Sequence, residues 1–398
     1  MYKETLSKDL TKLRYIEAAA EGSRHFLAKT GFAFLFLVVV FLIASASNGN
    51  DAYAPFVIAA GVCGAYMAMN IGANDVANNM GPAVGSKALT LSAALAIAAT
   101  FEAAGALIAG GDVVKTISKN IISVESFDNE LTFIWAMLSA LLAASLWIHI
   151  ATYVRAPVST THSIVGGVMG AGIGAAGFTI VNWGTMSKIA ASWVISPVLG
   201  GIIAAIFLAF INAFIIYQDD KIAGAKRWVP ALVAIMAGVF AAYLMLKGLK
   251  RVWKPEPWMI TAAAIAVGAI TYLVLKPYID RRATGMENRN KSIRTLFTVP
   301  LICSTALLSF AHGSNDVANA VGPLAAIVSA AASGEIATKV AIPFWVMCIG
   351  AVGISIGLAL FGPRLIRMVG DQITKMNPMR AYCVALSAAI TVLIASAL

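Results

Sequence analysis

The chain has 398 residues, of which 60% are hydrophobic and only 12% are charged. A soluble protein of this length carries about a quarter charged residues, so the composition excludes an ordinary soluble domain and indicates a membrane protein. The net charge of +10 does not indicate nucleic-acid binding, because lysine and arginine are confined to short hydrophilic connections, as membrane topology requires.

The N-terminal segment, residues 1–30, has leucine and isoleucine side chains at helical spacing. It lacks the short apolar core and cleavage site of a signal peptide, so it predicts an amphipathic helix on the membrane surface. The apolar runs that follow are each about twenty residues long, which is enough to cross a bilayer. We therefore expect an all-α polytopic membrane protein of about 12 membrane segments. The predicted helices lie near 31–47, 54–73, 83–110, 131–152, 164–181, 190–217, 228–246, 257–275, 294–313, 320–332, 338–362 and 379–398.

The first polar interruption is IGANDVANNMGP, residues 71–82, which places Asn74, Asp75 and Asn78 within apolar sequence. An ionised aspartate near the bilayer centre is costly and persists only with a partner or a water-filled cavity. Asp75 and Asn78 are three residues apart and would share one face of a helix. Because Pro82 cannot continue a helical hydrogen-bond ladder, a broken helix is expected here, with backbone groups free to contact a ligand.

Two further polar features follow the first motif. Glu102 is the only carboxylate in the apolar run 89–109, and it suits either a cation or proton ligand or a helix–helix hydrogen bond. In PVSTTH, the hydroxyls of Ser159, Thr160 and Thr161 precede an apolar helix. A helix N-terminus with free amides and hydroxyls favours anions such as phosphate or sulfate, although an ordinary helix cap is the alternative. A re-entrant hairpin tip would fit this short polar tract.

The first motif returns as GSNDVANAVGP from Gly313, where eight of eleven positions are identical. This copy supplies Asn315, Asp316 and Asn319, and its Pro323 predicts a second helix break. The chain is therefore expected to consist of two related halves. We place the first half at 31–275, with repeat 1 at 54–181 followed by connecting helices, a basic cytoplasmic loop at 276–293, and the second half, with repeat 2, at 294–398. Aligning Gly105 with Gly350 makes Met347 the counterpart of Glu102.

The distribution of basic residues predicts how the two copies are oriented. Six basic residues lie in segment 1–30 and none in the connection before helix 54–73, whereas helix 294–313 follows a strongly basic loop. The positive-inside rule then gives a cytoplasmic N-terminus and sends these two helices in opposite directions across a cell membrane. Two opposed copies form an inverted-topology repeat, in which the substrate site lies at the midplane between them.

The duplicated Gly-(Ala/Ser)-Asn-Asp-Val-Ala-Asn motif, with Pro-Val-Ser-Thr-Thr-His between the copies, resembles the inorganic phosphate transporter (Pit) family over about 64–111, 153–175 and 301–330. The resemblance implies import of inorganic phosphate coupled to Na⁺ or H⁺. Carried over by motif, it makes Asp75, Asn78, Asp316, Asn319 and Glu102 cation ligands, with Na⁺ at Asp75 and Asp316. It likewise makes Ser159, Thr160, Thr161, Asn74 and Asn315 phosphate ligands. By equal spacing a second Ser-Thr-Thr turn would fall near residue 400, so repeat 2 is expected to be cut short at Leu398.

A simple electrostatic argument connects the two kinds of ligand. Carboxylate oxygens suit hard cations, but two aspartates alone would repel an anion. Cations bound between them remove this repulsion, so cation binding raises anion affinity and the reverse holds equally. The expected function is Na⁺–phosphate symport in a multi-pass membrane protein, without enzyme activity or a cofactor beyond the transported ions.

Three alternatives to this function stay open, together with the oligomeric state, for which a homodimer is one candidate. They are H⁺-coupled phosphate symport, symport of another oxyanion such as sulfate, and a membrane phosphatase that uses Ser159 or Thr160 with His162 as base. The phosphatase has the least support, because no carboxylate that could orient His162 lies nearby in the sequence.

Overall fold

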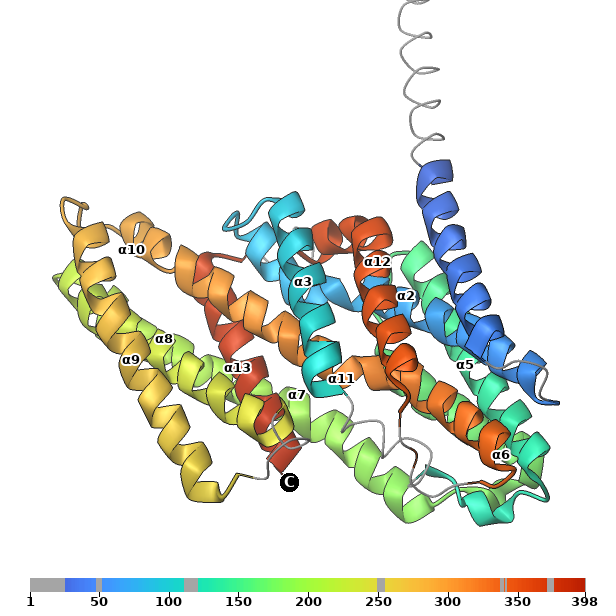
Figure 1. The fold of residues 1–398 in the computed structure, drawn as a ribbon. Coiled ribbons are helices and arrows are strands. Elements are labelled where there is room, and N and C mark those ends of the chain that lie inside the picture. The colour runs from blue at the N-terminus through green and yellow to red at the C-terminus, as the bar shows by residue number, and fades with distance from the viewer. Residues whose placement is uncertain are drawn as a thin grey trace, which may run out of the picture.

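The computed structural model describes residues 26–47, 52–110, 121–248, 255–336, 340, 342–370 and 376–397. Within these ranges the protein is all-α, with one isolated bridge between Ile122 and Val181. Nine described helices are long and apolar enough to cross a membrane, and they form one bundle (Figure 1). The all-α polytopic prediction is confirmed. Of the predicted surface helix at 1–30, residues 1–25 lie outside the described part.

The described helices have the following bounds. An N-terminal helix (Phe26–Ser47) precedes α2 (Ala54–Gly85), α3 (Leu91–Ala109), α5 (Glu130–Tyr153), α6 (Thr160–Ala176), α7 (Trp183–Ile211), α8 (Lys221–Tyr243), α9 (Pro257–Ala283), α10 (Asn290–Leu296), α11 (Thr298–Ser333), α12 (Phe344–Met368) and α13 (Pro378–Ala397). Short π-helical turns continue α7 over Asn212–Ile216 and α8 over Leu244–Gly248.

Both Asn-Asp motifs lie inside continuous helices, so the predicted helix breaks are wrong. Pro82 is inside α2 and Pro323 is inside α11. A proline removes one backbone donor and crowds the carbonyl one turn earlier, but each motif helix has more than 30 residues and is buried along much of its length. Tertiary packing therefore outweighs the local cost. The motifs therefore present polar side chains rather than an unwound backbone.

The predicted basic loop at 276–293 is also mostly helical. Helix α9 continues through Ala283 and α10 begins at Asn290, which leaves only 284–289 as the connection. Lys276 and Arg281 therefore extend the end of a transmembrane helix rather than a loop. Long cationic side chains tolerate this position, because they reach from a helix end into the headgroup layer.

Glycines allow two pairs of helices, α2 with α12 and α11 with α3, to approach each other unusually closely. The contacts in the two pairs are equivalent. A Cβ added to Gly72 of α2 would lie 2.0 Å from the backbone oxygen of Ile354 in α12, and one on Gly313 of α11 would lie 2.1 Å from that of Glu102 in α3. The contacts are reciprocal: a Cβ on Gly357 would meet Met69, and one on Gly105 would meet Phe310. Close backbone approach at small residues is a typical way for membrane helices to associate.

This matched packing corrects the predicted alignment of the second helices of the repeats. Gly105 occupies the position in α3 that Gly357, not Gly350, occupies in α12. The counterpart of Glu102 is therefore Ile354 rather than Met347. The error arose because glycine is frequent in both helices, so a Gly-Ala pair alone does not fix the register. Glu102 still has no acidic counterpart.

The two motif helices are antiparallel where they meet. Leu324 of α11 lies against Gly64 of α2, whereas His312 of α11 lies against Asp75 of α2. Along this contact, the residue numbers of α2 increase in the direction in which those of α11 decrease. Figure 1 shows the two helices running in opposite directions across the bundle. The two motif helices therefore run in opposite directions, as the distribution of basic residues predicted for them.

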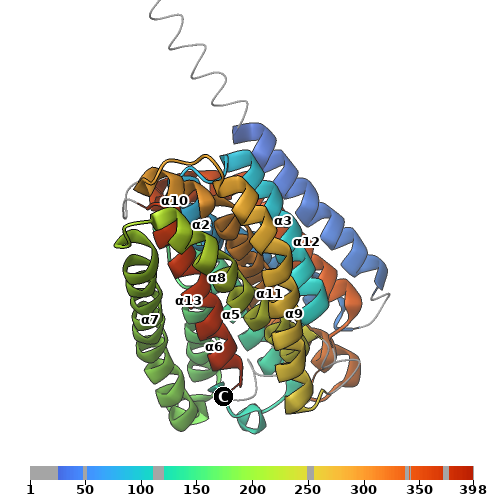
Figure 2. The ribbon, with the colours of Figure 1, turned by 90° about the vertical axis from the view of Figure 1, so that its left-hand side faces the viewer.

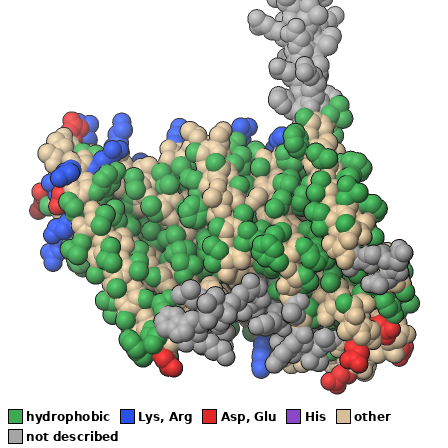
Figure 3. Space-filling model, in the orientation of Figure 1, with side chains coloured by type: hydrophobic (Ala, Val, Ile, Leu, Met, Phe, Trp, Pro, Cys, Tyr) green, Lys and Arg blue, Asp and Glu red, His purple; other side chains and the backbone are tan. Residues whose placement is uncertain are grey.

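Helices α7, α8 and α9 connect the two motif regions and lie to one side of them. Viewed from that side, α7 lies beside α13 and α8 lies near α9 (Figure 2). Their outer surfaces are strongly apolar: Trp258, Ile265 and Leu273 of α9 are each at least 66% exposed. Hydrophobic side chains cover the middle of the face in Figure 3, and most visible Lys and Arg lie along its upper edge. This is the surface of a protein that crosses a membrane.

Candidate functional site

Asn74 fastens the turn between α5 and α6 to the middle of α2. Its side-chain amide donates to Thr152 Oγ1 at 2.9 Å and to the backbone oxygen of Ala156 at 3.1 Å. Its side-chain oxygen accepts the backbone N–H of Val158 at 3.0 Å. All of these partners lie at the end of α5 or in the turn. Asn74 therefore holds the Ser-Thr-Thr tract in place, and its polar atoms are engaged in structural bonds.

The Ser-Thr-Thr tract forms the N-terminus of α6. Ser159 is the N-cap residue, and its hydroxyl accepts the backbone N–H of His162 at 3.2 Å. Thr160 is the first helical residue and is 1% exposed, and its hydroxyl donates to Asp75 Oδ2 at 2.8 Å. The positive end of the α6 dipole and its free amides therefore lie beside the first motif carboxylate.

The second motif contacts the same tract from α11. Asn319 donates its side-chain amide to Thr160 Oγ1 at 3.3 Å and to Thr161 Oγ1 at 3.1 Å. Asn319 is buried. The hydroxyls of the α6 N-terminus thus connect Asp75 of the first copy with Asn319 of the second, and the two repeats meet at one place.

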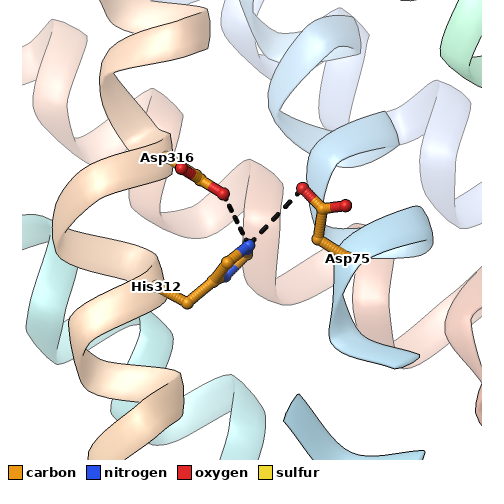
Figure 4. A group of neighbouring side chains, drawn as sticks. All are labelled: Asp75, His312 and Asp316. Atoms are coloured by element: carbon orange, nitrogen blue, oxygen red, sulfur yellow. Dashed lines mark ion pairs between the residues drawn. The ribbon is translucent and has the colours of Figure 1, made fainter. Parts of the chain in front are cut away.

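His312 lies between the two motif aspartates (Figure 4). Its Nε2 atom is 2.8 Å from Asp316 Oδ2, one helical turn further along α11, and 3.5 Å from Asp75 Oδ2 on α2. The ligating atoms of these three residues all lie within 4.8 Å of one another, so the group could hold a cation. A protonated imidazole here would partly neutralise both carboxylates.

Glu102 extends this cluster away from the cavity. It is fully buried, its Oε2 atom lies 3.4 Å from His312 Nδ1, and its Oε1 atom accepts the side-chain amide of Asn79 at 3.0 Å. A buried carboxylate requires such compensation. In the repeat alignment, Asn79 corresponds to Ala320 and Glu102 to Ile354. His312 corresponds to Ile71. All three polar members of this chain of contacts are therefore unique to one copy.

A cavity of about 280 Å³ opens beside the two aspartates. At about 30 Å³ per water molecule, it has room for a small oxyanion with several waters. Its walls combine carboxylates, an amide, an imidazole and hydroxyls. The residues that line it are Asp75, Asn78, Pro157, Val158, Ser159, Thr160, Thr161, His312 and Asp316.

The predicted site residues fall into two groups in the structure. The cavity is lined by six of them: Asp75, Asn78, Ser159, Thr160, Thr161 and Asp316. Four others lie behind its walls. Asn74 holds the turn, Asn319 bonds to the threonine hydroxyls, Glu102 contacts His312, and Asn315 lies beside Tyr243 of α8.

His312 is the cavity residue that the sequence analysis missed. The sequence has four histidines, and none of them is among the predicted cation or phosphate ligands, although one signal was available. His312 replaces Ile71 at the position immediately before the motif glycine, and it lies four residues before Asp316. An intramembrane histidine one turn from an aspartate shares its helix face and is a functional candidate.

Comparison with known proteins identifies the family. The sequence profile described as "Phosphate transporter family" matches residues 71–398. The chain belongs to this family. Similar proteins include two from Helicobacter pylori, both named "Putative phosphate permease". The one from strain J99 is 46% identical over 98% of this chain and 74% of its own length, and the one from strain 26695 is 47% identical over the same shares. A permease of that name from Thermococcus kodakarensis is 36% identical over 86% of this chain and 84% of its own length.

A solved structure of a similar protein has the same fold. The sodium-dependent phosphate transporter is 37% identical to this chain, with a TM-score of 0.80, and the match covers 86% of this chain and 84% of that one. Residues 71–398 contain the whole cavity lining. The resemblance seen in the motifs is thereby confirmed at the level of family and fold.

Proposed function

We propose that this phosphate transporter family member imports inorganic phosphate by symport with Na⁺ across the cell membrane. One observation carries the proposal: a single cavity is lined by the hydroxyls at the N-terminus of α6 and by carboxylates from both motif helices. Hydroxyls and free amides suit the phosphate oxygens, and the carboxylates suit a hard cation.

Electrostatics links the two ligands. Asp75 Oδ2 lies 2.8 Å from the Thr160 hydroxyl, so phosphate bound at the tract would be close to a carboxylate. Na⁺ at Asp75 and at Asp316 would remove this repulsion, with Asn78 as a further oxygen ligand. Each ligand then raises the affinity for the other. The name of the similar solved protein, a sodium-dependent phosphate transporter, supports Na⁺ as the coupling ion.

The antiparallel contact of α2 and α11 supports an inverted-topology repeat with alternating access around this cavity. The positive-inside rule further supports a cytoplasmic N-terminus.

Transport accounts for the site better than phosphatase activity does. The His162 ring packs against Trp193, with ring centroids 3.9 Å apart, and His162 is not among the residues that line the cavity.

Proton coupling is the second candidate, and His312 favours it. Its imidazole lies between Asp75 and Asp316, and histidine exchanges its proton near neutral pH. A proton on His312 could then replace one Na⁺ in neutralising the aspartates.

Separate ion gradients distinguish the two candidates. The purified protein is reconstituted into liposomes, and uptake of radiolabelled phosphate is measured with an inward Na⁺ gradient at equal pH, and with an inward H⁺ gradient without Na⁺. We expect concentrative uptake with the Na⁺ gradient alone. Uptake with the H⁺ gradient alone would establish proton coupling instead.

Competition by sulfate tests the substrate. Excess unlabelled sulfate should leave phosphate uptake unchanged, and strong competition would indicate a general oxyanion transporter.

Thr160→Val should lower kcat/KM for phosphate uptake by about 10- to 100-fold. The change keeps the shape of the side chain but removes the hydroxyl that donates to Asp75 and leaves Asn319 only Thr161 as an acceptor, and a buried group that loses its hydrogen bond costs about 1–3 kcal/mol. Initial uptake rates in proteoliposomes measure the effect. Thr261→Val on α9, whose hydroxyl bonds only to the backbone oxygen of Pro257 among the described residues, is the matched control. Equal rates for both variants would remove Thr160 from the site.

A further inference from the structure

Tyr243 is a polar residue of the connecting helices that reaches the second motif. It ends α8, where the helix changes to the π-helical turn Leu244–Gly248. Such turns often occur at functional positions. Helix α8 lies between the two repeats in the sequence, so Tyr243 has no repeat counterpart. It is 3% exposed, and a buried tyrosine hydroxyl requires a hydrogen-bond partner.

The partners of this hydroxyl all belong to the motif region of α11. It donates to Ser314 Oγ at 2.9 Å, and the backbone oxygen of Ala311 lies 3.5 Å away. The side chain of Asn315 lies beside the same hydroxyl. Tyr243 therefore bonds to Ser314, two residues before Asp316, and lies next to Asn315 between them. Its ring stacks with Phe240, which in turn packs edge-on against Phe310 of α11, and this packing fixes the position of the hydroxyl.

The first motif is held in a different way. Asn74, the counterpart of Asn315, bonds to Thr152, Ala156 and Val158 around the α5–α6 turn. Ser314 corresponds to Ala73, which has no hydroxyl. The serine and the tyrosine thus form a polar contact that only the second copy has. In the described structure, Asn74 is held from within its own repeat, whereas the residue before Asn315 bonds to a connecting helix.

We propose that Tyr243 is a positioning residue of the transport site: by its bond to Ser314 it holds the adjoining Asn315 and Asp316 in the geometry that binds the ion and phosphate together. This inference rests on the proposed function. Tyr243 is not among the residues that line the cavity, so it acts through α11 rather than by contact with the substrate. It also connects α8 to the motif helix, so a shift of α8 would change the position of Asn315.

Tyr243→Phe tests the proposal, because it removes the hydroxyl and keeps the ring that stacks with Phe240. We expect the KM for phosphate at saturating Na⁺ to rise about tenfold, with the maximal uptake rate within about twofold of the unchanged protein. A purely structural role would instead lower thermal stability and maximal rate and leave KM unchanged. Tyr278→Phe on α9, where the side chain is 41% exposed, is the control and should match the unchanged protein.

A double-mutant cycle with Ser314→Ala makes the test specific. Because the serine and tyrosine hydroxyls share one hydrogen bond, the double variant should have nearly the KM of Tyr243→Phe alone. An unchanged KM in Tyr243→Phe, or fully additive effects, would overturn the proposal. If the unchanged protein transports phosphate normally while Tyr243→Phe has no effect, only this inference fails. If the unchanged protein takes up no phosphate under any gradient, the proposed function fails, and this inference with it.

Discussion

Asp75→Asn should abolish Na⁺-dependent phosphate uptake while leaving the protein in the membrane. Asp75 is 4% exposed, lines the cavity, and lies close to both Thr160 and His312. An amide has nearly the same shape and its oxygen can still accept the Thr160 hydroxyl, but it carries no charge to hold a cation. Removing one partner of a buried charge pair costs about 3–5 kcal/mol, so we expect uptake to fall on the order of 100-fold or more.

The measurement is initial uptake into proteoliposomes that contain equal amounts of protein, with the Na⁺ gradient fixed. Asp219→Asn serves as the control, because Asp219 lies in the exposed connection before α8, far along the chain from either motif. It should transport normally. Uptake by Asp75→Asn at the rate of the control, with the same dependence on Na⁺, would show that this carboxylate is not a cation ligand.

Gly357→Ala and Gly105→Ala should each destabilise the whole bundle. The added Cβ would lie 1.9 Å from the backbone oxygen of Met69 in the first case and 2.0 Å from that of Phe310 in the second. Both contacts are with backbone atoms of another helix, so neither can be relieved by rotating a side chain. The paired helices must move apart, which costs about 3 kcal/mol or more through overpacking and lost contacts.

Thermal unfolding of the purified protein in detergent measures this effect. We expect Tm to fall by roughly 5–10 °C in either variant. Gly170→Ala on α6 is the matched control, because a Cβ at Gly170 would meet nothing within 4 Å and alanine favours the helix. The two destabilised variants should have similar losses, since their contacts are equivalent in the two repeats. An unchanged Tm in both would show that the helices do not approach this closely.

The side-chain chemistry of the site was predicted from the sequence more accurately than the backbone conformation around it. Asp75, Asp316 and the hydroxyls of Ser159, Thr160 and Thr161 do surround one cavity, because duplicated polar motifs in apolar sequence are costly unless they meet. The prolines misled the prediction: Pro82 and Pro323 suggested breaks, but both motif helices continue through them. Local propensity decides a helix end only where tertiary packing is weak, and these helices are the most buried in the bundle.

Residues without a repeat counterpart were the hardest to predict. The repeat drew attention to positions that match, whereas Asn79, His312 and Tyr243 contribute through contacts that the other copy lacks. Their partners lie on other helices, and the distances in sequence give no hint of the contact. The motif predicts Asn74 and Asn315 as phosphate ligands, whereas the packing shows that Asn74 bonds to the α5–α6 turn and that Asn315 lies beside Tyr243 of α8.

The reciprocal glycine contacts also affect how the protein is made. Helix α2 emerges early from the ribosome, whereas α12, against which Gly72 and Met69 pack, is among the last helices to be synthesised. At about 5–20 residues per second, α2 waits on the order of tens of seconds for its partner. The α5–α6 turn that bonds to Asn74 is made soon after α2, but Asp75 is in the membrane without His312 of α11 for most of that time. Proteins that assist membrane insertion would have to shield this helix until translation reaches the second repeat.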